Sequence, residues 1–243
     1  MAISIDNVYQ QVLAIANKEQ RGYITPQEFN LLARKAQLDI FEEYFHDIKN
    51  KGIGPDSSDE YGGSIDNLKE KVAVFEKWKV AMSAVSGNDC TLPTSSTVHK
   101  LGTVFYAAGS FDVVVDRVEK NDLHYMERNP KTKYTDRRPV YVRKTNSVIK
   151  LFPPSPTVSY TTSNVTCNFI AKPADPKWTY VVVGDKALYN GSDAGLQDFE
   201  LHASEESTLV NKILELAGIV INKPGLSEVI LRNEEIKEAN KNR

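Results

Sequence analysis

The chain has 243 residues, enough for one large domain or two small ones with their own cores. Its 30 basic and 32 acidic residues give a net charge of -2, which argues against a dedicated nucleic-acid or anionic-membrane binder and leaves only local anion contacts. No stretch approaches the ~20 apolar residues that span a bilayer, and the N-terminus lacks the pattern of a secretory signal. We therefore expect a protein made in the cytoplasm, without a membrane partner.

Helical periodicity predicts two helices in the N-terminal part. Apolar residues recur at helical spacing on one face of Ser4–Asn17. Thr25-Pro26-Gln27-Glu28 is a capping box with proline at the first helical position, and an apolar stripe follows from Phe29 to Ile48. We expect the two helices to pack as an antiparallel pair. Residues 52–64 are rich in Gly, Ser and Asp and predict a flexible acidic loop.

Short β-branched or aromatic runs separated by turn residues fill the middle of the chain. These runs are Val80–Val85, Thr103–Tyr106, Asp112–Val118, Val140–Arg143, Val148–Phe152, Val165–Ala171 and Thr179–Val183. Because no helical crossover is evident between them, they predict an antiparallel sandwich or meander.

Helical signals return after Ser204, which caps a helix with the apolar face Leu209 to Val220, and Ser227 caps a last one. The predicted fold class is α+β, with an N-terminal helix pair and C-terminal helices flanking an antiparallel β sandwich or meander. The expected parts are residues 1–76, helical with the acidic loop; 77–200, β-rich; and 201–243, helices that pack with the N-terminal ones.

No nucleophile elbow, phosphate-binding loop or dinucleotide fingerprint occurs in the sequence. The four histidines lie in different predicted elements without metal-ligand spacing: His46, His99, His124 and His202. Cys90 and Cys167 each lie alone in a β-like stretch, which is typical of reduced, buried thiols. We expect no catalytic residues, no metal site, no cofactor and no enzymatic activity.

Residues 128–144 carry seven basic residues against one acidic residue, Asp136. This density makes five of them candidates for contact with DNA or an acidic partner: Arg128, Lys131, Lys133, Arg137 and Arg138. A solvated loop without a partner is the alternative interpretation.

Two stretches resemble structural proteins of tailed bacteriophages, and the similarity covers most of the chain. The first is Asn17 to Pro26, followed by Phe29-Asn30 and Ala36-Gln37. The second comprises Pro139–Val142, Lys172–Trp178, Asp198–His202, Ser204–Glu206, Leu209-Val210, Ile213-Leu214 and Ala217-Gly218. In particular, these motifs are similar to head-to-tail connector, collar or tail-tube-like ring subunits of short-tailed phages.

The resemblance implies a virion structural protein of the tail or collar. It would form a ring, typically a dodecamer, that links the portal protein to other tail or collar proteins around the exit channel of the genomic DNA. In that setting we expect apolar helical faces to contact neighbouring copies or the portal, through Leu209, Ile213, Leu214, Val229, Ile230 and Ile236.

Two other functions compete with this hypothesis. Trp178 and Tyr180 would serve a β-sandwich module that binds a carbohydrate or a peptide, although an aromatic beside prolines is more often packed in a core. A nuclease or hydrolase without a known motif would need carboxylates that gather only in the folded chain.

Overall fold

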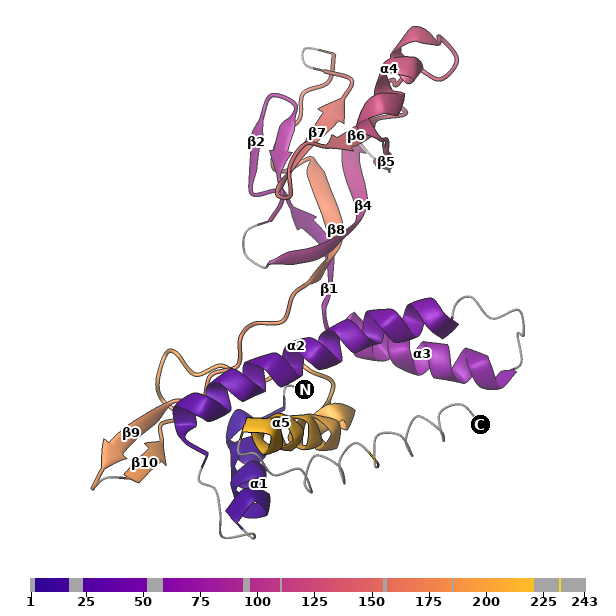
Figure 1. Cartoon of the computed structure of the whole chain (residues 1–243). Coiled ribbons are helices and arrows are strands. Elements are labelled where there is room, and N and C mark those ends of the chain that lie inside the picture. The colour runs from indigo at the N-terminus through magenta and orange to yellow at the C-terminus, as the bar shows by residue number, and fades with distance from the viewer. Residues whose placement is uncertain are drawn as a thin grey trace. The chain divides into compact units, whose positions relative to one another are not determined.

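The structure is a computed structural model of the chain, and it describes residues 3–17, 24–51, 59–93, 97–109, 111–154, 157–184, 186–220 and 232. The fold is mixed α+β (Figure 1). The chain divides into two compact units: unit 1 combines residues 1–74 with residues 173–243, and unit 2 comprises Phe75–Lys172. The β-rich part therefore ends at Lys172 instead of residue 200, and the segment after it belongs with the helices.

Three of the predicted helices of unit 1 are present, whereas the last one, which Ser227 was expected to cap, lies outside the described residues except for Arg232. The three helices are α1 (Ile5–Asn17), α2 (Pro26–Lys51) and α5 (Glu206–Val220), the last preceded by a 3-10 turn, Ala203–Glu205. The capping box of α2 is formed, because the Glu28 amide donates to Thr25 Oγ1 at 3.3 Å and the Thr25 amide donates to Glu28 Oε2 at 2.9 Å. These hydrogen bonds to Thr25 hold the pKa of Glu28 below its usual value.

The core of unit 1 forms around α5. Both α1 and α2 pack mainly against α5, so the expected pairing of α1 directly with α2 is not the main helix contact. Val8 and Val12 of α1 and Phe29 of α2 are fully buried. Amphipathic stripes predict that a helix has a partner, but they do not say which helix that partner is.

A third helix, α3 (Asp59–Ala73), occupies much of the region where we expected a flexible acidic loop. Residues 52–58 of that loop lie outside the described residues. The pair Gly62-Gly63 misled the sequence interpretation, since each glycine costs a helix about 1 kcal/mol relative to alanine. Burial of Leu68 and Val72 near the end of α3, which packs against α2, offsets that cost.

Residues 173–200 join the helical unit through a buried polar network. Gln37 of α2, 1 % exposed, donates from Nε2 to the Ala174 carbonyl at 2.7 Å and accepts from the Glu200 amide at 3.1 Å. The Glu200 carboxylate in turn accepts from the Ala174 amide at 2.8 Å. Since a buried amide without partners would be costly, these bonds fix the segment on α2.

Unit 2 is one eight-stranded sheet. Its strands are β1 (Glu76–Ala81), β2 (Ala84–Ser86), β3 (Asp89–Thr91), β4 (Val98–Ala108), β5 (Phe111–Arg117), β6 (Val140–Arg143), β7 (Val148–Phe152) and β8 (Val165–Ala171). They are arranged in the order β1-β8-β4-β5-β6-β7-β3-β2. The bounds of β6, β7 and β8 agree with the prediction, whereas β3 was recognised only as a β-like stretch around Cys90.

All the pairings in this sheet are antiparallel except that of β5 with β6. A parallel pair requires a crossover connection, and the short helix α4 (Lys120–Arg128) lies within it. The expectation that no helix separates the strands was therefore wrong. The signal was weak because α4 is short and buries no residue.

The sheet curls so that its two edge strands follow each other in the chain. Only Met82 and Ser83 separate β1 from β2, and their amides donate to Val165 of β8 at 3.3 Å and to Thr91 of β3 at 3.0 Å. The concave side encloses one hydrophobic core, in which Cys90 and Cys167 are fully buried. The two thiols are free, and burial raises the pKa of Cys90 to about 12 and that of Cys167 to about 11.

In the part of the chain that is described, no helix has the length and apolar character needed to cross a membrane.

The burial of both thiols predicts their reactivity. In the native protein, Cys90 and Cys167 should react with a thiol reagent only as fast as the chain unfolds, because reaction requires an exposed thiolate. The measurement is the rate of modification across a denaturant series. Fast modification of native protein would contradict the enclosed core.

Candidate functional site

The structure assigns three of the six predicted interface residues to the internal core. Leu209, Ile213 and Leu214 of α5 are 0–3 % exposed in the single chain, because α5 packs against α1 and α2. These side chains leave no surface for a neighbouring copy or a portal protein, so their expected interface role is not retained. The other three, Val229, Ile230 and Ile236, lie outside the described residues.

Trp178 lies in the core of unit 1 and is 2 % exposed. Its indole Nε1 donates to Asp6 at 3.0 Å, and its backbone exchanges hydrogen bonds with the side-chain amide of Asn30 at 2.8 and 3.1 Å. Its ring also lies 4.3 Å from that of Tyr9. A buried indole with a satisfied N–H has no free face for a sugar or a peptide, so the geometry does not favour the binding-module alternative at this residue.

Trp178 instead supports a β-hairpin, formed by β9 (Tyr180–Val183) and β10 (Lys186–Tyr189) as a separate two-stranded sheet. The rings of Tyr180 and Tyr189 both stack on the indole, with centroids 5.7 and 6.0 Å away. The buried hydroxyl of Thr179 donates to the Asn190 carbonyl at 2.7 Å and closes the base of the hairpin. The base is therefore fixed to the helical unit.

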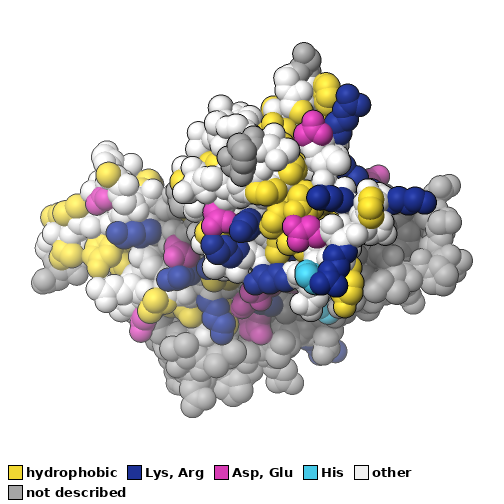
Figure 2. Space-filling model, turned by 90° about the horizontal axis from the view of Figure 1, so that it is seen from above, with side chains coloured by type: hydrophobic (Ala, Val, Ile, Leu, Met, Phe, Trp, Pro, Cys, Tyr) yellow, Lys and Arg dark blue, Asp and Glu magenta, His cyan; other side chains and the backbone are white. Residues whose placement is uncertain are grey.

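Beyond its base, this hairpin is apolar and exposed. The register pairs Val181 with Leu188 and Val182 with Ala187, so these pairs lie on opposite faces. Val181, Val182 and Val183 are 50–64 % exposed, and Leu188 is 51 % exposed. The hydrophobic side chains at the left-hand end of Figure 2 lie where Figure 1 places β9 and β10. Antiparallel sheets usually present one polar face to water, but apart from Lys186, which pairs with Val183, the described side chains of these two strands are apolar or tyrosine.

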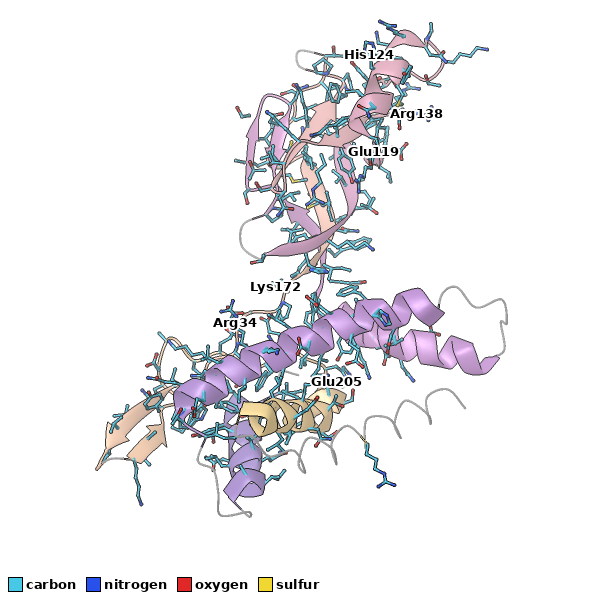
Figure 3. The ribbon with its side chains drawn as sticks, in the orientation of Figure 1. Arg34, Glu119, His124, Arg138, Lys172 and Glu205 are labelled. Atoms are coloured by element: carbon cyan, nitrogen blue, oxygen red, sulfur yellow. The ribbon has the colours of Figure 1, made fainter. Side chains whose placement is uncertain are left out.

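The second candidate surface is the basic loop, residues 128–138, which follows α4 in unit 2. It brings together all five predicted basic residues: Arg128, Lys131, Lys133, Arg137 and Arg138. Each is exposed, and none forms an ion pair with a residue that the structure describes. Figure 3 shows Arg138 close to α4, together with His124 and Glu119. The loop therefore presents uncompensated positive charge.

Hydrogen bonds order this loop. Asn129 accepts from the amides of Lys131, Thr132 and Lys133 at 3.0–3.1 Å, through its side chain and its carbonyl. Thr135 and Arg138 exchange two backbone hydrogen bonds at 3.1 and 3.2 Å. The cationic side chains thus extend from a defined backbone, which lowers the entropy lost when an anion binds.

Tyr134 anchors the same loop to the sheet. Its side chain is buried, its ring packs 5.3 Å from Phe152 of β7, and its hydroxyl donates to Glu127 Oε1 of α4 at 2.7 Å. Burial, followed by the hydrogen bond to Glu127 and its negative charge, raises the pKa of Tyr134 to about 12.

A hollow of about 380 Å³ at the start of α4 adds basic residues that the sequence analysis did not single out, Arg117 and Lys120. Arg143 also lines it. Arg117 pairs with Glu119 at 3.2 Å, and Arg143 donates to Asn146 at 2.9 and 3.1 Å. These cations are partly neutralised, so the loop remains the stronger anion-binding surface. In sequence, Arg117 and Lys120 lie close to acidic residues, so charge density did not reveal them.

Among the described residues, no three His, Cys, Asp or Glu side chains gather as a metal site would require. The hollow beside α4 contains one carboxylate, Glu119, and an apolar groove elsewhere in unit 2 contains one, Glu76.

A comparison with protein-family models found no match to this chain, and no curated protein matched it either. Its function is therefore argued from the two surfaces above.

The anchor residue gives a stability prediction. Tyr134→Phe removes the hydroxyl that donates to Glu127 and should lower the free energy of unfolding by about 1 kcal/mol, measured in urea. Tyr125→Phe is the matched control, since Tyr125 of α4 is 72 % exposed and should tolerate the change.

The pKa of the same residue predicts a dependence on pH. Folding holds the pKa of Tyr134 near 12, above the usual value of about 10, so its contribution to stability is complete below pH 10 and is lost as pH rises toward 12. The stability difference between wild type and Tyr134→Phe should shrink over that interval. A constant difference would contradict the burial of this hydroxyl.

Proposed function

We propose that the protein is a virion structural subunit that assembles with copies of itself into a ring in the head-to-tail connector or collar of a tailed phage. The ring would link the portal to the tail around the DNA exit channel, with a geometric and not a catalytic role. The observation that carries the proposal is the β9–β10 hairpin, which has exposed apolar side chains on both faces in the single chain. The motifs similar to those of phage connector proteins support the same conclusion.

The energetics of the hairpin favour assembly. A two-stranded hairpin is marginally stable in water, and its outer edges offer unpaired backbone groups. The exposed valines, Leu188 and Tyr189 present on the order of 400 Å² of apolar surface, within the range that marks interaction sites. Covering that area is worth about 10 kcal/mol before the costs of association.

A closed ring multiplies such contacts. Each subunit in a ring has two neighbours, so a contact too weak to hold a dimer acts many times within one particle. Along the chain, the helical segments of unit 1 precede and follow the β-rich unit, as expected from the sequence. The number of copies, a dodecamer, is an expectation from the resemblance.

The basic loop suits the second requirement of a connector, contact with DNA or with an acidic surface of the portal. Its cations are exposed, form no ion pair with the part of the chain that the structure describes, and are held on an ordered backbone. The contact is local, because the whole chain has a net charge of -2.

Substitutions of the exposed valines in the hairpin should prevent assembly. Val181→Thr with Val182→Thr places one hydroxyl on each face and keeps β-branched residues in the strand, so folding should be preserved. We expect the variant to be largely monomeric by size-exclusion chromatography with light scattering, at concentrations where wild type is oligomeric. Circular dichroism checks the fold.

Leu31→Gln is the matched control, because Leu31 of α2 is 70 % exposed but lies outside the hairpin. It should leave the oligomer intact. A wild-type protein that is monomeric at every concentration and lacks affinity for virion components would refute the proposed function.

The basic loop predicts a dependence on salt. If the loop contacts DNA phosphates, Arg137→Gln with Arg138→Gln should weaken binding to duplex DNA equally across sequences. It should also reduce the slope of log K against log salt by about 2, because each phosphate contact releases about one counterion. Binding is measured by fluorescence anisotropy.

Lys35→Gln with Lys69→Gln removes the same charge from exposed positions of α2 and α3 and should leave the slope unchanged. Equal losses in the two double variants would mean that total charge, and not the loop, determines binding. An unchanged affinity in the Arg137 and Arg138 variant would leave an acidic protein surface as the partner of the loop.

A further inference from the structure

Unit 2 has an apolar groove that takes no part in the contacts proposed above. Residues of β1, β4 and β8 line a volume of about 280 Å³, among them Trp78, Leu101 and Ile170. This volume is below the usual range for small-molecule sites, about 300–1,000 Å³, but it is large enough for a few aliphatic side chains. Trp78 at its rim is 72 % exposed, which is unusual for so large an apolar side chain.

Irregularities in two strands shape the groove. The pairing of β1 with β8 shifts between Lys77 and Val80, and that of β4 with β8 shifts between Leu101 and Val104. Lys79, within the first shift, has φ +46°, a strained value for a residue with a side chain, and its amide donates to the Asn168 side chain at 2.8 Å. Such bulges are typical of places where a sheet is adapted to a function.

Gly102 lines the groove in the second irregularity. A Cβ atom there would lie 3.0 Å from the Asn168 carbonyl oxygen, so a side chain at this position would require the β8 backbone to shift by a few tenths of an ångström. The absence of a side chain at this position helps to keep the groove open.

The groove continues into a strip of apolar and charged side chains on the outer face of the sheet. The Trp78 ring lies 6.3 Å from that of Phe105, and Phe105 pairs across the strands with Val114, which is 50 % exposed. The Lys79 ammonium, which pairs with Asp112, lies 5.6 Å from the centroid of the Phe105 ring. The strip lies on the face opposite the enclosed core, whose residues alternate with these along the strands.

We infer that the β9–β10 hairpin of one copy docks in the Trp78 groove of the next copy, which gives a head-to-tail contact. This inference rests on the proposed function and names the two surfaces that meet. The hairpin is a narrow apolar projection on unit 1, and the groove is an apolar depression on unit 2. Within its own unit, neither the exposed side chains of the hairpin nor Trp78 at the groove is covered by other described residues.

The area to be covered favours this partner over a hairpin-to-hairpin dimer. Pairing two hairpins would bury on the order of 400 Å² of each subunit once and would leave Trp78 exposed. The head-to-tail contact covers both surfaces of every subunit with one type of interface. A contact between different surfaces propagates, and it closes into a ring when the rotation between subunits allows.

Cysteine cross-linking tests this contact, because the two native thiols are buried. One preparation carries Val182→Cys on the hairpin, and the other carries Thr103→Cys, an exposed residue of the groove. With a short bis-maleimide reagent, covalent dimers should form efficiently only when the two preparations are mixed. A chain with both substitutions should give a ladder of higher species. Tyr125→Cys mixed with Val182→Cys is the control and should stay monomeric on the gel.

Quenching by iodide gives a second measurement that needs no cross-linker. The chain has two tryptophans, Trp178 buried and Trp78 exposed, so iodide should quench the fluorescence of Trp78 in the monomeric Val181→Thr, Val182→Thr variant. Assembly of the wild type should protect most of that emission.

The outcomes separate this inference from the proposed function. Cross-linked dimers of Val182→Cys alone would overturn the head-to-tail contact but not self-assembly. The same conclusion would follow if the wild type assembles, the mixed preparations do not cross-link and iodide still quenches Trp78. A wild type that never assembles and has no affinity for virion components would overturn both.

Discussion

The packing of Trp178 determines what unit 1 presents to the outside. The indole lies among Tyr9, Tyr180 and Tyr189, and its N–H and backbone are satisfied by Asp6 and Asn30. These partners come from α1, from α2 and from both strands of the hairpin, so one side chain joins segments that are far apart in sequence. Because Tyr180 and Tyr189 stack on the fixed indole ring, the base of the hairpin is rigidly supported. The outer part of the hairpin leaves four apolar side chains exposed to water, those of Val181, Val182, Val183 and Leu188.

The surface that we propose for assembly is therefore different from the one that the sequence suggested, although self-assembly is proposed in both cases. The apolar faces of the terminal helices suggested that other chains must cover them, yet the described part of α5 is covered by α1 and α2 of its own chain. The uncovered apolar surface lies instead in a strand pair of four residues each. An amphipathic stripe shows how much surface a helix must bury, but it does not distinguish an internal partner from an external one. Only the three-dimensional packing makes that distinction.

Local chemistry explains which parts were predictable. The capping box at Thr25, the stripe of α2 and the alternation in β8 depend on neighbours within a few residues, and the structure has them where the sequence places them. The clustering of the five cations of the basic loop could also be read from the sequence, because they are close together in the chain, but their contact with DNA or an acidic partner stays a prediction. The curl of the sheet, the parallel pairing of β5 with β6 and the hairpin's exposure were not predictable, since they depend on distant contacts. Val181–Val183 illustrates the limit, because a continuous apolar run is typical of a strand buried on both faces.

Two distinct apolar surfaces on one chain have a consequence for the type of assembly. A self-complementary patch stops at a dimer, whereas a hairpin and a groove on different units leave one of each free after every addition. With on the order of 400 Å² contributed from each side, one contact lies below the roughly 1,200–2,000 Å² of a stable pair, so short oligomers are weak. Closure removes the last two free surfaces at once and adds a contact without a further loss of translational freedom. A subunit that assembles as we propose would be stable in a complete ring and unstable in a fragment of one, as the proposed connector would require.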